Sequence, residues 1–190
     1  MGDSKTYSPL EPMLIIFGGL PATGKTTIAR DLALRLDATY VRIDSIEQAL
    51  RDSARMKIKD KGYRVAYRVA EDNLRLGRIV ISDSVNPIRL TRDAWIDVAH
   101  RAHACAAEVE VICSDQQCHR HRVETRSVDI CGLKIPKWED VISREYEPWD
   151  RKHIVIDTAQ MTVAEAVEEL QDALQKMPPA AELQISTPKD

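Results

Sequence analysis

One ten-residue stretch carries the residue types that bind a chain of phosphates. Residues 18–27 read GGLPATGKTT, in which Gly19, Gly24, Lys25 and Thr26 fit the pattern G-x-x-x-x-G-K-[ST]. Glycines let backbone N–H groups turn inward around an anion, and a helix that starts in the loop directs the positive end of its dipole at the phosphates. Lys25 can reach the β- and γ-phosphates, and the Thr26 hydroxyl can bind Mg²⁺. The residues expected to bind the nucleotide are Gly19, Leu20, Pro21, Ala22, Thr23, Gly24, Lys25, Thr26 and Thr27.

Five short apolar runs, separated by helical patterns, indicate the fold. Runs without alternation are typical of strands buried on both faces of a parallel sheet. The predicted strands are residues 13–17, 40–43, 79–81, 109–113 and 153–157. Helices are predicted from the glycine-rich stretch to about residue 36, from 45 onward, and at 63–76, 91–106, 114–126, 138–146 and 162–176, with a charged loop at 51–61. The order predicts an α/β fold with a mostly parallel five-stranded sheet and helices on both faces.

Two aspartates directly follow predicted strands, where ligands bind in such folds. Asp44 could accept the proton of a substrate hydroxyl or orient that hydroxyl. It would equally suit the N-cap of the following helix, and the two roles are compatible. Asp83 ends an apolar strand and could bind Mg²⁺ near Thr26; the alternative is a turn residue at a strand end. Asn86 marks a turn that could line the acceptor pocket.

The helix predicted after the fourth strand carries a pair of arginines. Arg122 and Arg126 are four residues apart and therefore share one helix face. Mobile arginines can stabilise a transferring phosphoryl group, and they often lie on a lid that closes over ATP. The alternative is a solvated basic face paired with acidic neighbours. Ser114 and Gln117 fit a capping box for this helix. Three further side chains of the helix are expected at the surface: Arg120, His119 and His121.

The segments around the predicted fifth strand give weaker indications of ligand contacts. Residues 157–159 should lie beside the adenine. Three aromatic residues follow the predicted lid, and helix packing is the favoured interpretation over the floor of a ring-binding pocket: Trp138, Tyr146 and Trp149. Thr162 and Glu165 fit a second capping box.

Composition indicates an ordinary globular chain. The 190 residues are 44% hydrophobic and 30% charged, with a formal net charge of −3, so no strong field favours nucleic acid or membranes. We expect a flexible leader at 1–12, one domain at 13–176 with a lid at about 114–150, and a mobile tail at 177–190. No signal peptide or membrane span is evident, and a reducing cytoplasm is expected for the four cysteines, whose spacing fits no standard zinc site.

Together, these motifs resemble the small P-loop kinases of the AAA_33 type, a group that includes shikimate and gluconate kinases, zeta toxins and polynucleotide kinase domains. The chain is most similar to the branch that resembles chloramphenicol phosphotransferase. There the second strand ends in Asp-Ser, as at Asp44, and the third ends in aspartate, as at Asp83. The fourth ends in cysteine, as at Cys113, and a lid helix with R-x-x-x-R follows, as at Arg122 and Arg126.

The resemblance implies a P-loop NTPase three-layer sandwich with a helical lid, and ATP- and Mg²⁺-dependent phosphoryl transfer to an alcohol. It implies that Lys25, Asp44, Arg122 and Arg126 are catalytic, with Asp44 as base or hydroxyl-orienting residue. Polynucleotide kinases carry an arginine where Glu47 stands, and an acidic group repels a terminal phosphate, so a small hydroxyl-bearing substrate is expected rather than nucleic acid. The alternatives are a polynucleotide or nucleotide-sugar kinase and a non-catalytic ATP-binding module. The identity of the acceptor, the division of roles between the two arginines and the oligomeric state stay open.

Overall fold

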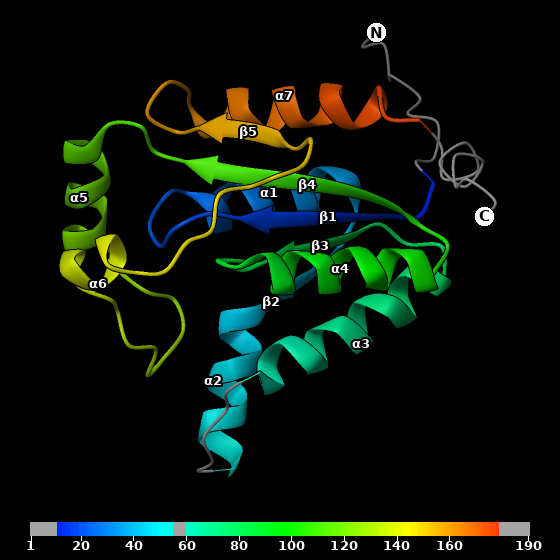
Figure 1. The fold of residues 1–190 in the computed structure, drawn as a ribbon, viewed down its shortest axis with the longest axis horizontal. Coiled ribbons are helices and arrows are strands. Elements are labelled where there is room, and N and C mark those ends of the chain that lie inside the picture. The colour runs from blue at the N-terminus through cyan, green and yellow to red at the C-terminus, as the bar shows by residue number, and fades with distance from the viewer. Residues whose placement is uncertain (1–10, 55–59, 179–190) are drawn as a thin grey trace, which may run out of the picture.

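All five strands form one parallel sheet, as predicted. The computed structural model describes residues 11–54 and 60–178. The strands lie in the order β2-β3-β1-β4-β5, which places β1 at the centre (Figure 1). Their bounds are β1 Met13–Gly18, β2 Thr39–Arg42, β3 Val80–Asp83, β4 Cys105–Ile112 and β5 Ile154–Asp157.

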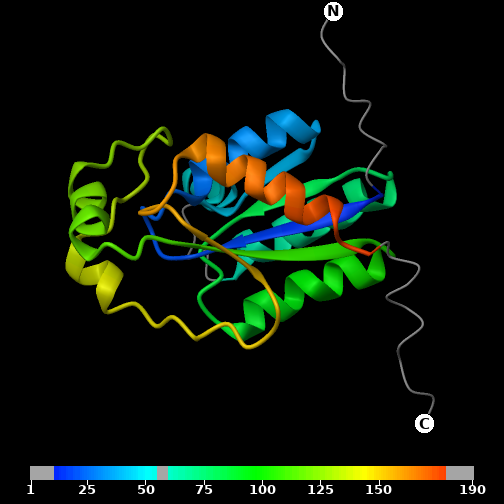
Figure 2. The same cartoon turned by 90° about the horizontal axis from the view of Figure 1, so that it is seen from above.

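Helices cover both faces of the sheet. Their bounds are α1 Lys25–Leu36, α2 Ile43–Ala54, α3 Lys61–Arg75, α4 Arg89–Arg101, α5 Gln116–Thr125, α6 Trp138–Ile142 and α7 Val163–Gln175. Helices α1 and α7 lie on one side and α4 on the other (Figure 2). Side chains of β1 enter the two cores in alternation, with Ile15 and Phe17 under α1 and α7, and Leu14 and Ile16 under α3 and α4. The result is a three-layer α/β sandwich.

Several predicted element boundaries are wrong, among them the start of β4, which lies at Cys105 rather than at residue 109. The helix predicted at 91–106 ends at Arg101, because His103 takes a left-handed backbone conformation with φ of 54° and the next residues pair with β1. There, burial in the sheet overrides the helix propensity of an alanine-rich run. Helix α2 continues to Ala54 into the predicted loop, and the helix predicted at 138–146 ends at Ile142.

Of the two predicted capping boxes, one is wrong and one is confirmed. Asp115, rather than Ser114, caps α5, since its carboxylate accepts hydrogen bonds from the backbone N–H groups of Gln117 and Cys118. The capping box of Thr162 and Glu165 at α7 is confirmed. Most of the predicted leader and tail lies outside the described residues. Among the described helices, none has the length and apolar character needed to cross a membrane.

Candidate functional site

The carboxyl ends of the strands open into a cavity of about 880 Å³. Segments far apart in the sequence form its wall: the loop after β1, the start of α2, the end of β3, and the segment between β4 and β5, whose helices α5 and α6 stand beyond the strand ends (Figure 1). The predicted catalytic and metal-binding residues all lie on this wall: Lys25, Thr26, Asp44, Asp83, Arg122 and Arg126. Of the other residues predicted to bind the nucleotide, Pro21, Ala22, Gly24 and Thr27 line the cavity, and Gly19, Leu20 and Thr23 do not. The structure therefore brings together the side chains that the strand order predicted to converge.

The loop at residues 19–24, here the phosphate loop, depends on its glycines. A Cβ at Gly19 would lie 2.1 Å from the backbone oxygen of Val111, and the φ of Gly19 is 131°. Gly24 has a φ of 100° and caps α1 at its N-terminus. Thr158 after β5 supports the loop, because its hydroxyl donates to the backbone oxygen of Thr23 at 2.8 Å. The loop thus presents backbone to the cavity at the N-terminus of α1, the geometry that suits a phosphate chain.

Lys25 is almost fully buried at the base of the cavity. Its Nζ atom donates a hydrogen bond of 2.8 Å to the backbone oxygen of Leu20. Burial is the main cause that lowers the pKa of Lys25 to about 8; Arg126 and Arg144 act in the same direction, and Asp83 and Asp44 oppose the shift. Two carboxylates and two guanidinium groups therefore act electrostatically on this one ammonium group.

Asp83 is held by two neighbours on β2. The register of the sheet places it between Phe17 and Arg42. The Tyr40 hydroxyl donates to Asp83 Oδ2 at 2.6 Å, and Arg42 Nε lies 3.9 Å from the same oxygen. Burial and the adjacent Asp83 raise the pKa of Tyr40, so the phenol stays a donor.

Arg42 also reaches the segment between β4 and β5. Its Nη1 atom lies 3.0 Å from both carboxylate oxygens of Asp129, and Arg30 of α1 pairs with the same carboxylate. The hydrogen bond from Arg30, and then that from Arg42, hold the pKa of Asp129 far below its usual range. Asp129 thereby joins residues 126–137, here the lid loop, to α1 and to the end of β2.

Asp44 is the second residue of α2 and lines the cavity. The N-cap interpretation is wrong, since the helix already begins at Ile43. One turn further on, Glu47 lines the same wall and pairs with Arg51 at 2.7 Å. Burial raises the pKa of Glu47, although Arg51 opposes the shift. The partner Arg51 weakens the repulsion that Glu47 alone would exert on an anion.

The two predicted arginines occupy different surroundings. Arg122 donates to the Thr158 hydroxyl at 2.6 Å and to the Thr158 backbone oxygen at 3.0 Å, beside the phosphate loop. Arg126 follows α5 directly and lines the cavity. The solvated-face interpretation is therefore wrong for Arg122, which is anchored to the loop after β5. It holds for Arg120, which pairs with Glu124 at the surface.

Several other expectations concern side chains near the cavity. His119 is buried, against expectation, and its Nε2 atom lies 2.8 Å from the backbone oxygen of Pro21, with Trp138 against its ring. Asn86 is also buried and donates to the backbone oxygen of Phe17, off the cavity wall. Packing is confirmed for the aromatic segment: Trp138 is buried beside His119, and Trp149 donates to the Tyr146 hydroxyl at 2.8 Å.

Sequence reasoning missed part of the wall. The overlooked residues are Arg30, Arg42, Arg51, Asp129, Lys134 and Arg144. A charged residue inside the apolar run 40–43 was a signal for Arg42. The lid loop and the residues after α6 show no periodicity that could have placed Lys134 or Arg144.

A parallel sheet in the order 2-3-1-4-5, with a G-x-x-x-x-G-K-T loop after the central strand, is the architecture of a P-loop NTPase-like fold. The profile of the AAA_33 family, described as an AAA domain, matches residues 14–130. The chain belongs to this family. No curated protein matches its sequence.

Solved structures with this fold include small kinases. The APS kinase of Mycobacterium tuberculosis, in complex with AMPPNP and APS, is 19% identical with a TM-score of 0.63, covering 88% of this chain and 100% of its own. A gluconokinase from Sinorhizobium meliloti is 17% identical with a TM-score of 0.61, covering 93% and 98%. Kti12 of Chaetomium thermophilum, in complex with ADP-AlF3, is 26% identical with a TM-score of 0.62, covering 85% and 98%. The two kinases are similar in fold.

Proposed function

We propose that the protein is an ATP-dependent kinase that transfers the γ-phosphate of ATP to a hydroxyl group of a small molecule. The observation that carries the proposal is the position of Asp44. Its carboxylate lines the same cavity as the phosphate loop, close enough to act on the charge of Lys25. A nucleotide-binding site alone does not need a carboxylate there, whereas transfer to an alcohol does.

The donor half of the site consists of the phosphate loop and the residues beside it. Backbone N–H groups of the loop and the N-terminus of α1 would bind the phosphates, and Lys25 would exchange its bond to Leu20 for the β- and γ-phosphates. Arg126 and Arg122 would approach the nucleotide from α5, with Arg122 on the side of Thr158. The kinase relative that contains AMPPNP supports the choice of nucleotide.

Thr26 at the start of α1 and Asp83 at the end of β3 fit a magnesium ion. Thr26 and Asp83 line the cavity, and a hydroxyl plus a carboxylate supply the hard oxygen atoms that Mg²⁺ prefers. Tyr40 and Arg42 hold the Asp83 carboxylate in place. When bound, the ion would neutralise phosphate charge.

In the acceptor half, Asp44 would receive the hydroxyl proton or orient the hydroxyl toward the γ-phosphorus. The new bond joins the acceptor oxygen to phosphorus, the bond from phosphorus to the β-phosphate oxygen breaks, and ADP leaves. Because positioning dominates phosphoryl transfer, the rigid start of α2 matters as much as the basicity of the carboxylate.

The test compares Asp44→Asn with Asp52→Asn, a change on the same helix at a carboxylate outside the cavity wall. Across a broad panel of alcohols with ATP and Mg²⁺, phosphorylated product is measured by mass spectrometry and ATP binding by calorimetry. Asp44→Asn should lower transfer by about 10²- to 10⁴-fold with ATP binding kept, and Asp52→Asn should match the wild type. Undiminished transfer in Asp44→Asn refutes the role of Asp44, and ATP binding without transfer to any alcohol favours a nucleotide-binding module.

A further inference from the structure

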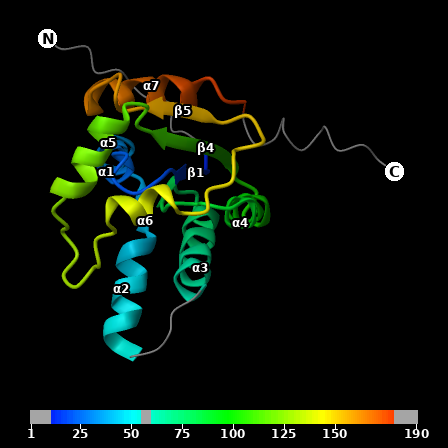
Figure 3. The ribbon, with the colours of Figure 1, turned by 60° about the vertical axis from the view of Figure 1, so that its left-hand side comes forward.

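One part of the cavity lies between α2 and the lid loop, and we name it the acceptor compartment. The two walls are in direct contact, since a Cβ at Gly132 of the lid loop would lie 3.0 Å from Gln48 Nε2 of α2. The lid loop runs beside α2 in two views of the molecule (Figures 1 and 3). Asp44 lies on the α2 wall of this compartment, so it is the space in which an acceptor would meet the γ-phosphate.

Four of the eight lid-loop residues that line the cavity are apolar. They are Val128, Leu133, Ile135 and Pro136. Among the described residues, no phenylalanine, tyrosine or tryptophan lines the cavity, so a nucleobase would find no aromatic ring on which to stack. These four side chains suit an aliphatic or carbocyclic portion of the acceptor, because the hydroxyl groups of a polyhydroxylated sugar would find no polar partner on them.

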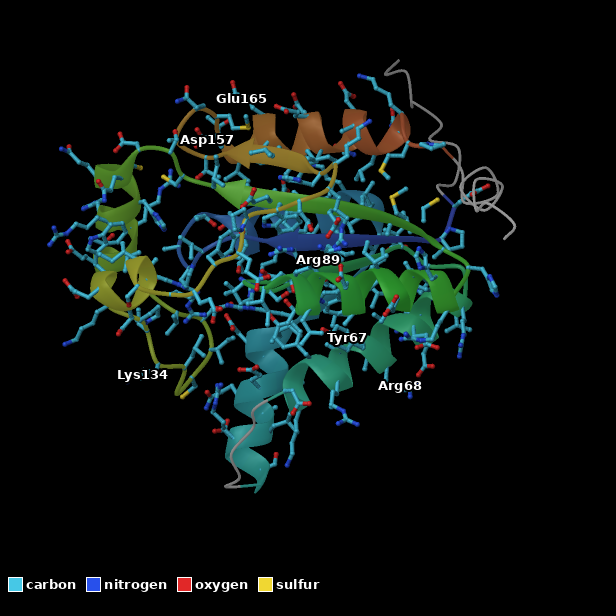
Figure 4. All side chains as sticks on the ribbon, viewed as in Figure 1. Tyr67, Arg68, Arg89, Lys134, Asp157 and Glu165 are labelled. Atoms are coloured by element: carbon cyan, nitrogen blue, oxygen red, sulfur yellow. The ribbon has the colours of Figure 1, made fainter. Side chains whose placement is uncertain are left out.

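The compartment also contains one cationic side chain that has no carboxylate partner among the residues that the structure describes. On the α2 wall, Glu47 and Arg51 pair with each other, which leaves Asp44 for the hydroxyl. On the opposite wall lies Lys134, an exposed side chain near the tip of the lid loop (Figure 4). Within the described part of the chain, Lys134 has no ion-pair partner.

The other cations of the cavity that have no carboxylate partner belong to the phosphate end. Arg126 and Arg144 both act on the charge of Lys25, and Arg122 is bonded to Thr158 beside the phosphate loop. The phosphates of ATP would balance these four positive charges. Lys134 therefore remains to balance a charge on the acceptor itself.

We propose that the acceptor is a hydroxy acid with an apolar body, a substrate class that rests on the proposed kinase function. Its hydroxyl group meets Asp44, its carboxylate pairs with Lys134, and its hydrocarbon portion contacts Leu133 and Ile135. In the transfer, the acceptor oxygen bonds to the γ-phosphorus, the hydroxyl proton passes to Asp44 and then to solvent, and ADP departs. The carboxylate takes no part in bond changes and fixes the orientation of the hydroxyl.

The experiment uses matched pairs of alcohols that differ only in carrying a carboxylate or a primary amide. The pairs are hydroxyhexanoate and hydroxyhexanamide, hydroxymethylbenzoate and hydroxymethylbenzamide, and gluconate and gluconamide. Phosphorylated product is quantified by mass spectrometry to give kcat/KM for each, in the wild type, in Lys134→Gln and Lys134→Arg, and in Lys152→Gln as a control at an exposed lysine outside the cavity wall.

With the two apolar scaffolds, the wild type should prefer the acid over the amide by about tenfold, since a charge-assisted contact replaces a neutral one. The preference should approach unity in Lys134→Gln, return in Lys134→Arg and persist in Lys152→Gln. Equal turnover of acid and amide in the wild type, a preference that survives Lys134→Gln, or a better rate with gluconate overturns the inference while the kinase function stands. Binding of AMPPNP with no product from any alcohol overturns the kinase function, and the inference falls with it.

Discussion

Raising the pH should weaken ATP binding through a single buried lysine. Lys25 has its pKa lowered to about 8, chiefly by burial, and its ammonium group contacts the backbone oxygen of Leu20. Bound phosphates would place negative charge beside that ammonium group and raise its pKa again. ATP therefore binds the protonated form of Lys25 more tightly than the neutral form.

The magnitude follows from the two pKa values. If the bound pKa is at or above the ordinary 10.5, binding takes up about half a proton at pH 8, and the dissociation constant of ATP rises about fivefold from pH 8 to 9 and approaches a tenfold rise per pH unit above that. In the nucleotide-free protein, raising the pH has the opposite effect and stabilises the fold. The unfolded chain holds its lysine proton up to the higher pKa, so the free energy of unfolding rises between pH 8 and about 10.5. The unfavourable contribution below pH 8 amounts to about 3 kcal/mol, because one pKa unit corresponds to about 1.36 kcal/mol.

The assay is calorimetric titration with ATP from pH 7.5 to 9.5 in two buffers of different ionisation enthalpy, which gives affinity and proton uptake together. Lys152→Gln removes an exposed lysine away from the cavity and should keep the slope. Lys25→Arg retains a charge that does not titrate in this range and should bind with no slope. Lys25→Met should abolish binding yet raise the free energy of unfolding of the nucleotide-free protein. A pH-independent dissociation constant in the wild type, with no proton uptake at pH 8, would refute the reasoning.

Three further substitutions test other contacts. Tyr40→Phe removes the 2.6 Å hydrogen bond to Asp83 and should lower the free energy of unfolding by about 1.5–3 kcal/mol in urea titrations; an unchanged midpoint would show that Asp83 needs no such donor. Asp129→Asn should loosen the lid loop from Arg30 and Arg42, so that hydrogen exchange in residues 126–137 accelerates, whereas unaltered exchange would mean that packing alone holds the loop. Thr162→Ala removes the capping box of α7 and should cost about 1 kcal/mol, measured by thermal unfolding, with no change in ATP affinity.

The part of the cavity wall formed at the strand ends could be predicted from the sequence, because regular elements position it. A parallel sheet brings the ends of its strands to one edge, so residues directly after strands converge without knowledge of any contact. Asp83 ends β3, Asp44 follows β2, and Lys25 begins the helix after the β1 loop, and all three line the cavity. Boundaries failed where tertiary burial competes with local propensity, as in the alanine-rich start of β4.

The lid-loop side of the cavity wall could not be predicted from the sequence in the same way. Asp129 is positioned by ion pairs with Arg30 and Arg42, which are 99 and 87 residues distant in the chain. A contact of that kind leaves no periodic trace in the sequence, and the lid loop has no helix or strand to impose one. The prediction that His119 lies at the surface was wrong for a related reason. Its ring contacts the backbone oxygen of Pro21, which belongs to a loop far away in the sequence.

The order of the strands has a consequence for how substrate range could diverge. The phosphate loop follows the central strand β1, whereas α2 follows the edge strand β2 and the lid loop lies in the connection to the opposite edge strand β5. Connections at the edges of a sheet tolerate insertion and exchange better than central ones, because fewer neighbours constrain them. A change of length or sequence in either of these two peripheral connections would therefore alter the wall around Asp44 and leave the phosphate loop at the centre of the sheet in place.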